Sequence, residues 1–191
     1  PSRKVLQTFF ALDTQTGQPI GCGIGSPGVN TTKATIELLN MVKTVNKNAL
    51  ILADKEHFTE NLVRDIDQNS DFELLIPAIS TERIRKIERS LTYQRQWAGY
   101  ATAEMMFNFE KRKEKYRLIC QREGETTKDY VYKSFLTLSN KPIIELLCDC
   151  YQERWSIEEF FNFDGAMGFD RASTFNLNVR YGKMSLALLA Q

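Results

Sequence analysis

The stretch of sequence that decides the fold is residues 49–54, Ala-Leu-Ile-Leu-Ala-Asp. Five apolar residues in succession, with no polar alternation, are typical of a strand that is buried on both faces of a sheet. Such strands belong to α/β proteins, which place their functional groups at the carboxyl ends of the strands. Asp54 is therefore the first candidate functional residue. The simpler alternative is that Asp54 only begins a turn, with Lys55 and Glu56 solvated beside it.

Residues 1–80 contain the elements of a mixed α/β sheet. The hydrophobic pattern predicts strands at residues 5–13, 18–26, 49–53 and 72–79, and helices from Thr31 or Thr32 to residue 45 and over residues 60–68, the second capped by Thr59. A turn at residues 14–17, with Gly17 supplying a positive φ, joins the first two strands into a hairpin. The order strand, strand, helix, strand, helix, strand predicts an α/β fold.

The next segment, residues 81–138, is predicted to be a β-rich insertion. A basic stretch with helical character at residues 81–95 comes first, and strands follow at residues 100–109, 116–123 and 130–138. Alternating side chains such as Tyr116, Leu118 and Cys120 are typical of half-buried antiparallel strands.

A long helix is predicted over residues 143–162, with Pro142 well placed in its first turn. We therefore divide the chain into residues 1–80, 81–138 and 139–191. We expect residues 1–80 and 139–162 to form one mixed sheet with flanking helices, and residues 81–137 to form a separate antiparallel patch.

Composition excludes a disordered chain, since 42% of the 191 residues are hydrophobic and 11% are aromatic. Lys plus Arg is 25 and Asp plus Glu is 24, so the net charge indicates no partner. Residues 80–117, however, carry 10 basic and 5 acidic side chains, which makes this segment the best candidate for an anion-facing surface. The alternative is a solvated charged face. The candidate anion-binding residues are Arg83, Arg85, Lys86, Arg89, Lys111, Arg112, Lys113, Lys115 and Arg117.

Other sequence features bear on location and completeness. The apolar runs are too short to span a bilayer and no signal segment is visible, so we expect a cytoplasmic location and no membrane partner. The four cysteines and the single histidine, His57, do not have the spacing of a closed metal site, so we expect reduced thiols used as small apolar residues. The chain opens on Pro1 without Met and stops at Gln191 after an apolar run, which predicts a fragment of a longer protein.

Three polar residues of the predicted helix share one face. Tyr151, Arg154 and Glu158 are three and four residues apart, which places them in one stripe. A guanidinium one turn before a carboxylate can orient it and keep it ionised, as a hard cation requires of its ligand. The alternative is an ordinary surface pair, but Leu147 and Trp155 close by indicate a face that is at least partly buried.

This stripe carries a resemblance to a known family. Residues 151–161, Tyr-Gln-Glu-Arg-Trp-Ser-Ile-Glu-Glu-Phe-Phe, resemble the Tyr-x2-Arg-x3-Glu signature of bacterial insertion-sequence transposases of the DDE class. Residues 49–58 are similar to the strand that bears the second catalytic aspartate of that family. The hairpin with residues 16–20 and the tail at residues 176–182 are similar as well, so the resemblance covers nearly the whole chain.

The resemblance implies a ribonuclease-H-like core in which two aspartates and one glutamate hold two Mg²⁺ or Mn²⁺ ions for attack on a phosphodiester. Asp54 and Glu158 are then catalytic, metal-binding residues, with Tyr151 and Arg154 as their support. The resemblance also implies that the basic insertion tracks DNA phosphates. The partners that the family implies are transposon ends and target DNA, bound by a homodimer in a bacterial, nucleoid-associated setting.

The chain departs from the family pattern at two places. The signature continues with a Lys seven positions beyond the glutamate, and this chain has Gly165 there. The first aspartate is either Asp13, which also follows an apolar strand, or a residue upstream of Pro1. The ribonuclease-H order has three strands before the first helix and only two are predicted here, which favours the upstream position.

Three functions remain open. The favoured one is a fragment of a transposase catalytic domain, which cleaves and transfers DNA strands in its full-length form. The second is a ribonuclease-H-like nuclease without strand transfer. The third is a DNA-binding or interaction remnant that has lost catalysis, which a missing first aspartate favours.

Overall fold

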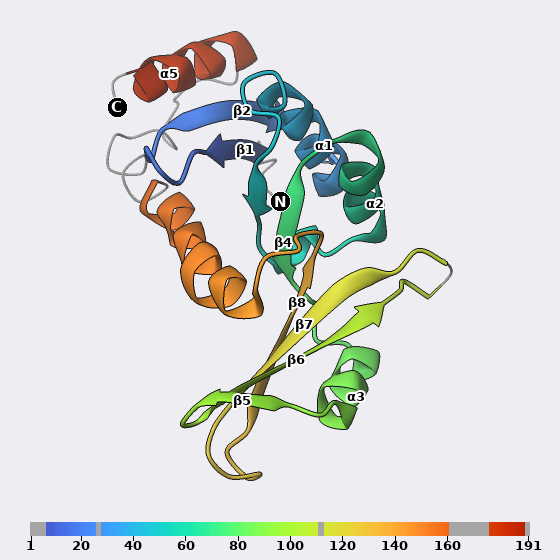
Figure 1. Cartoon of the computed structure of the whole chain (residues 1–191). Coiled ribbons are helices and arrows are strands. Elements are labelled where there is room, and N and C mark those ends of the chain that lie inside the picture. Colours follow the sequence, from blue (N-terminus) through green and yellow to red (C-terminus); the bar gives the residue numbers. More distant parts are fainter. Residues whose placement is uncertain (1–6, 26–27, 111–112, 161–175, 190–191) are drawn as a thin grey trace, which may run out of the picture. The chain divides into compact units, whose positions relative to one another are not determined.

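The computed structural model describes residues 7–25, 28–110, 113–160 and 176–189. The chain forms two compact units, one from residues 1–46 and 152–191 and the other from residues 47–151. Figure 1 shows the elements of both units, which are described separately below.

The first unit contains an antiparallel hairpin with a helix packed on it. β1 (Gln7–Leu12) pairs with β2 (Pro19–Gly25), as predicted. α1 (Thr31–Val42) lies against the hairpin at Gly21, where a Cβ atom would stand 3.1 Å from Leu38 Cδ1 and 3.3 Å from Val42 Cγ2. Gly21 therefore lets the helix approach the strand closely. α5 (Leu177–Leu189) belongs to the same unit and buries Met184.

The predicted N-cap of α1 was wrong by one residue. Asn30, and not Thr31 or Thr32, precedes the helix in extended conformation, and its Oδ1 accepts a hydrogen bond from the Lys33 backbone N–H at 3.3 Å. An asparagine side chain satisfies the first free amides of a helix as well as a threonine does.

The second unit is built on a six-stranded sheet with the order β3-β4-β8-β7-β6-β5. β3 and β4 are parallel, and every other neighbouring pair is antiparallel. The strands are β3 (Leu50–Leu52), β4 (Glu73–Pro77), β5 (Gln94–Trp97), β6 (Tyr100–Phe107), β7 (Tyr116–Glu123) and β8 (Val131–Thr137). The helices of this unit are η1 (Lys55–His57), α2 (Glu60–Asn69), α3 (Glu82–Ser90) and η2 (Glu145–Cys150). This mixed sheet with flanking helices confirms the predicted α/β fold class.

The expected separate antiparallel patch was wrong. β4 pairs with β8 in the register Leu75↔Thr137 and Pro77↔Phe135, so the strands of residues 94–137 extend the sheet that β3 and β4 begin. Leu74, Leu75 and Ile76 are completely buried, and a strand of this kind needs a partner on each side. β8 is that second partner. β1 and β2, by contrast, form a two-stranded sheet of their own.

Two other expectations need correction. The apolar strand before Asp54 is half-buried and not fully buried, because β3 pairs with β4 alone among the described strands and lies at the sheet edge. The helix predicted over residues 143–162 is present over residues 143–160, but it is not a regular α-helix throughout. It contains the π-helical part η2, which is followed by the 3₁₀ turn η3 (Tyr151–Trp155). Residues 161–162 lie outside the described residues.

A buried carboxylate ties α3 to the sheet. Glu88 is only 6% exposed, and its Oε1 accepts a hydrogen bond from the Ser134 hydroxyl of β8 at 2.7 Å. The Ser134 hydroxyl also lies 3.2 Å from Cys120 Sγ. Burial raises the pKa of the Cys120 thiol to about 11, so Cys120 stays a neutral thiol in this cluster. The tie therefore holds the basic helix α3 at a fixed place on the sheet.

Replacement of Glu88 by Ala is expected to lower the free energy of unfolding by about 1–3 kcal/mol, because the buried Ser134 hydroxyl loses its acceptor. Ser134→Ala removes the same bond, so the double variant should lose less than the sum of the single losses. Urea denaturation followed by circular dichroism measures all three. Arg85→Ala, on the exposed side of the same helix, is the control and should stay within about 0.5 kcal/mol of the wild type. Strict additivity of Glu88→Ala and Ser134→Ala would contradict the tie.

Candidate active site

Asp54 lies at the carboxyl end of β3, where the sequence predicted it. It is the N-cap of η1, and its Oδ1 accepts hydrogen bonds from the Glu56 backbone N–H at 2.9 Å and from His57 Nδ1 at 3.0 Å. The Asp54 side chain is 51% exposed, and its Oδ2 accepts no hydrogen bond from the residues that the structure describes. One carboxylate oxygen is thus held in place and the other faces solvent, as a ligand for a cation requires.

The analysis of the sequence missed the role of His57. A carboxylate oxygen only accepts hydrogen bonds, so the proton of the contact with Asp54 is on His57 Nδ1. The His57 side chain is 23% exposed, which restricts its movement next to Asp54. The available signal was a lone histidine three residues after the candidate aspartate, the spacing at which a side chain reaches back to an N-cap.

Asp13 occupies both of its carboxylate oxygens in the turn between β1 and β2. Oδ1 accepts from the Gln15 backbone N–H and Oδ2 accepts from the Thr16 hydroxyl, each at 3.0 Å. The Asp13 carbonyl accepts from the backbone N–H of Gly17, whose φ of +70° only glycine adopts easily. These bonds are those of an aspartate that organises a tight turn.

Glu158 is held by the arginine one turn before it. Arg154 Nη2 donates to Glu158 Oε1 at 2.9 Å, which confirms the expected contact. The side chain of Arg154 is mostly buried and that of Glu158 is partly open. The Arg154 guanidinium also lies over the Trp155 ring at 5.2 Å from its centroid. Trp155 itself is exposed, so the expectation that this residue marks a buried face was wrong.

Tyr151 is anchored in the core of the 47–151 unit. Its ring packs edge-on against Phe135 with the centroids 4.9 Å apart, next to the cluster of Leu75, Ile119, Leu146 and Leu147. Tyr151 thus connects the start of η3 to the sheet.

A shared metal between Asp54 and Glu158 stays a prediction, because the two residues belong to different units of the chain. Among the described residues, no group of three or more His, Cys, Asp or Glu side chains is arranged to hold a metal ion. Gly165, at the position of the signature Lys, lies outside the described residues.

Comparison with models of known protein families identifies the family of this chain. The model of the transposase DDE domain family matches residues 2–191. The chain belongs to this family. It follows that the protein is of the transposase and nuclease class, with DNA as the substrate and divalent metal as the usual cofactor of the family. No curated protein matches the chain. Among the described residues of this transposase domain, none of the helices has the length and apolar character needed to cross a bilayer.

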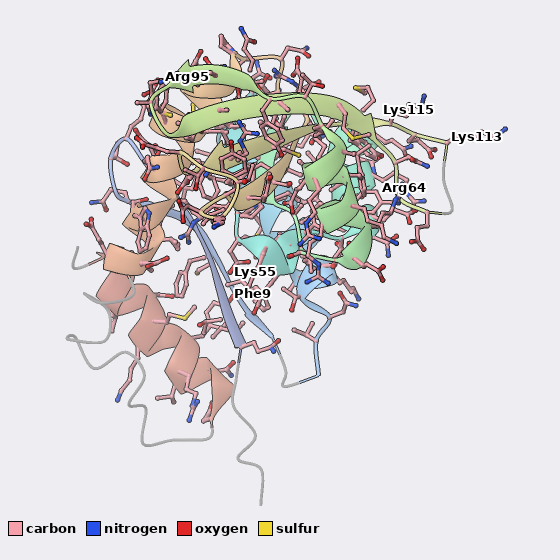
Figure 2. The ribbon with its side chains drawn as sticks, turned by 90° about the horizontal axis from the view of Figure 1, so that it is seen from below. Phe9, Lys55, Arg64, Arg95, Lys113 and Lys115 are labelled. Carbon is pink, nitrogen blue, oxygen red and sulfur yellow. The ribbon has the colours of Figure 1, made fainter. Side chains whose placement is uncertain are left out.

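Seven of the nine predicted DNA-binding cations of the transposase domain lie among the described residues, and they fall into two groups. Three of them already have partners: Arg83 with Asn108 and the Phe107 ring, Lys86 with Glu82, and Arg117 with Glu104 and two backbone carbonyls. Four others are exposed and pair with no carboxylate among the described residues: Arg85, Arg89, Lys113 and Lys115. Lys111 and Arg112 lie outside the described residues. In Figure 2, Lys113 and Lys115 project at one end of the unit.

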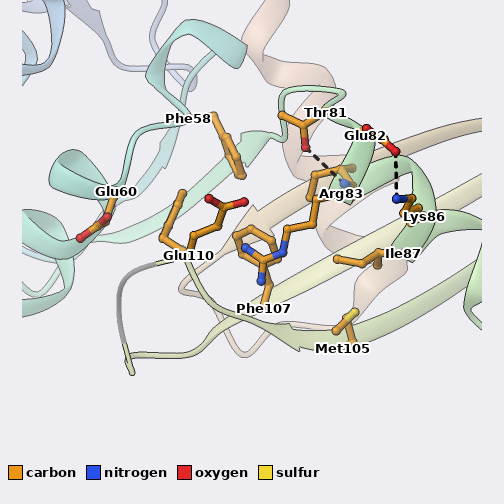
Figure 3. Close-up of a pocket in the computed structure, with 12 residues that line it drawn as sticks. Phe58, Glu60, Thr81, Glu82, Arg83, Lys86, Ile87, Met105, Phe107 and Glu110 are labelled. Carbon is orange, nitrogen blue, oxygen red and sulfur yellow. Dashed lines mark hydrogen bonds and ion pairs between the residues drawn. The ribbon is translucent and has the colours of Figure 1, made fainter.

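An open groove of about 1020 Å³ lies between α3 and β6 (Figure 3). Its apolar wall is the ring cluster of Phe58, Phe107 and Phe109, with centroids 5.4–6.2 Å apart. Arg83 covers this cluster, with its guanidinium 4.7 Å from the Phe107 centroid. The Arg83 guanidinium therefore packs on the aromatic cluster. As a result, Arg83 is less available to a DNA phosphate than the sequence indicated.

Replacement of Asp13 by Ala is expected to lower the free energy of unfolding by about 1 kcal/mol, because the turn loses its two side-chain hydrogen bonds. Asp13→Asn is the matched control. It keeps the Oδ1 acceptor for the Gln15 amide and should cost less. Urea denaturation measures both. Unchanged stability in Asp13→Ala, together with a loss of Mn²⁺ binding, would show that Asp13 is a metal ligand and not a turn residue.

Proposed function

We propose that the chain is part of the catalytic domain of a DDE transposase that cleaves DNA strands and transfers them to a target. The observation that carries the proposal is the Asp54 carboxylate at the end of β3, with Oδ1 fixed and Oδ2 open, in a chain that matches the transposase DDE domain over residues 2–191. Asp54 and Glu158 are the proposed metal-binding acids.

The chemistry of these side chains fits a divalent ion. Mg²⁺ and Mn²⁺ prefer carboxylate oxygens, and both Asp54 and Glu158 keep their side chains partly open to solvent. When bound, the two ions of a complete site lower the pKa of water and polarise the phosphodiester for in-line attack.

The remaining residues position the two acids. The His57 N–H fixes one oxygen of Asp54, and the Arg154 guanidinium holds one oxygen of Glu158. Supporting hydrogen bonds of this kind orient a carboxylate before the ligand arrives. Tyr151 anchors the segment that leads to Arg154 through its contact with Phe135.

We propose that the third carboxylate is supplied by a strand upstream of Pro1. Two observations support this source. Both oxygens of Asp13 are engaged in a turn. β3 has a partner on one side only among the described strands, so its other edge has backbone groups available to a further strand. A strand added there would run next to Asp54.

The alternative that catalysis is lost applies to the chain of residues 1–191 taken alone. Two acids provide too few oxygens to hold two ions against their hydration. In this case the isolated chain binds DNA but does not cleave its strands. The finding that favours this alternative for the isolated chain is the use of Asp13 in the turn.

The isolated chain is expected to bind Mn²⁺ weakly and to nick supercoiled DNA little, because one of the two metal positions lacks a ligand. Calorimetric titration with Mn²⁺ and a plasmid nicking assay check this, with Asp13→Ala as the parallel variant. Robust nicking that disappears in Asp13→Ala would identify Asp13 as the first catalytic aspartate.

Protein extended by its natural upstream residues is the positive control. It should cleave DNA, and Asp54→Asn or Glu158→Gln should reduce cleavage by more than the loss of about 10–100-fold typical of a supporting residue. His57→Phe should show that smaller loss. Cleavage that survives Asp54→Asn would refute the proposed site.

DNA binding is expected to survive without metal and to weaken steeply with salt, because phosphate contacts need no metal. The double variant Lys113→Ala/Lys115→Ala should reduce the slope of log K against log salt concentration by about 2, because each lysine pairs with one phosphate. Fluorescence anisotropy with duplex DNA at several salt concentrations measures the slope. The control is Lys33→Ala, which should leave the slope unchanged. Lys33 is an exposed lysine that pairs with Glu37, and both residues belong to the unit of residues 1–46 and 152–191. Equal effects of both variants would show that binding is not localised to residues 113–115.

A further inference from the structure

The turn that carries Asp54 has little to hold it in place from within. η1 spans only Lys55–His57 and buries none of its side chains. The His57 N–H donates to the Asp54 carbonyl at 3.1 Å, and the Phe58 N–H then closes the turn on the Lys55 carbonyl at 3.1 Å. Such 3₁₀ turns are short and have poor hydrogen-bond geometry, so they do not fix their own position. The place of η1 therefore depends on the side chains next to it.

Phe58 follows η1 directly and packs its ring against the end of β6. The Phe58 centroid lies 6.2 Å from that of Phe107 and 5.5 Å from that of Phe109, and the last two rings meet edge-on at 5.4 Å. Figure 3 shows Phe58 and Phe107 pointing into the same groove. Aromatic pairs of this kind are more stable than their buried area alone accounts for. The Phe58 ring therefore joins η1 to the sheet.

The ring cluster is itself held by two further elements. Arg83 of α3 lies over the Phe107 ring at 4.7 Å from its centroid. Phe109 packs edge-on against Tyr116 of β7 with the centroids 6.1 Å apart, and Tyr116 is the register partner of Phe107. The cluster therefore stands at the end of β6 and β7 where their connection begins, and this connection carries two of the predicted DNA-binding lysines.

We propose that Phe58 is a positioning residue for Asp54: its ring fixes η1, and with it the carboxylate, relative to the DNA-binding end of β6 and β7. The η1 turn supplies the Glu56 N–H and the His57 ring that hold Asp54 Oδ1, so a shift of the turn moves the carboxylate as well. The inference rests on the proposed function, in which Asp54 holds a divalent ion. It adds to that site a side chain that acts through the turn and needs no contact with metal or DNA.

A purely structural role for Phe58 is the competing interpretation, and Phe72 is the ring that distinguishes the two roles. Phe58 is only partly buried, whereas Phe72 is 5% exposed, so loss of the Phe72 ring removes more buried apolar area. β3 and β4 are parallel, with Leu50 opposite Glu73. Phe72 is therefore at the amino end of this strand pair and Asp54 is at its carboxyl end. Phe72 should matter more for stability, and Phe58 more for the site.

His57 is the single histidine of the chain and gives a readout that needs neither metal nor DNA. The nitrogen chemical shifts of a neutral, isotopically labelled imidazole show which ring nitrogen carries the proton, and the bond to Asp54 places it on Nδ1. Phe58→Ala should lose this preference for Nδ1–H, because η1 no longer presents the ring to Asp54. Phe58→Tyr keeps the ring and should restore the preference. Phe72→Ala is the matched control and should retain it.

The second readout separates strand cleavage from DNA binding. In protein extended by its natural upstream residues, Phe58→Ala should lower the rate of cleavage by about 10–100-fold, the usual effect of losing a group that orients a metal ligand. Its Kd for duplex DNA should stay unchanged, because the lysines of the β6–β7 connection are intact. Lys113→Ala/Lys115→Ala should instead raise the Kd.

The outcomes separate the positioning role from the proposed function. If Phe58→Ala keeps the Nδ1–H form, or if Phe72→Ala loses it equally, the positioning role is refuted while the proposed function stands. If Asp54→Asn leaves cleavage intact, the proposed function fails, and the histidine signal still decides whether Phe58 orders the turn. Circular dichroism checks the fold of each variant, and Phe58→Leu or Phe72→Leu takes the place of an alanine variant that does not fold.

Discussion

The pairing of β4 with β8 is the interaction on which the rest of the 47–151 unit depends. It joins the parallel pair β3–β4, which carries Asp54, to the antiparallel strands β5 to β8. The Thr137 hydroxyl donates to the Leu74 carbonyl at 2.7 Å, and the Leu138 N–H reaches the same carbonyl at 3.0 Å. Thr137 is almost completely buried, so these bonds are shielded from water. The position of the candidate aspartate is thus set by residues more than sixty positions further along the chain.

This long-range dependence explains which parts of the fold the sequence predicted. Helix α2 with its Thr59 cap, the strand β7 and the hairpin β1–β2 are determined by neighbours in the sequence, and each was found where periodicity and turn residues indicated. The pairing of β8 with β4, by contrast, joins residues that are far apart in the sequence. The sequences of β4 and β8 show that each strand needs partners, but they do not show that the two strands pair with each other. Short-range patterns therefore predicted a separate antiparallel patch, whereas the strands form one continuous sheet.

The candidate site shows the same division. The place of Asp54 at the end of a strand was predictable because an apolar run that stops on a carboxylate is a local signal. The Arg154–Glu158 contact was predictable because four residues separate the two positions. The fixed oxygen of Asp54 depends on His57 in a 3₁₀ turn, and a lone histidine has many structural explanations. Asp13 has the same apolar context as Asp54, and only its hydrogen bonds distinguish the two: Asp13 has both oxygens occupied by its turn, whereas Asp54 has one.

The positive charge of residues 80–117 is distributed differently from what a count along the sequence indicates. Arg83, Lys86 and Arg117 are engaged within the fold, so the exposed cations are Arg85 and Arg89 on α3 and a further set near the two ends of β6 and β7 (Figure 2). Arg95 lies near Tyr100 at one end, and Lys113 and Lys115 lie near the paired residues Phe107 and Tyr116 at the other. At roughly 3.4 Å per residue, this ladder is about 24 Å long, the rise of about seven base pairs of duplex DNA. If DNA binds along β6 and β7, as the proposed phosphate contacts require, one duplex of this length meets the cations at both ends at once.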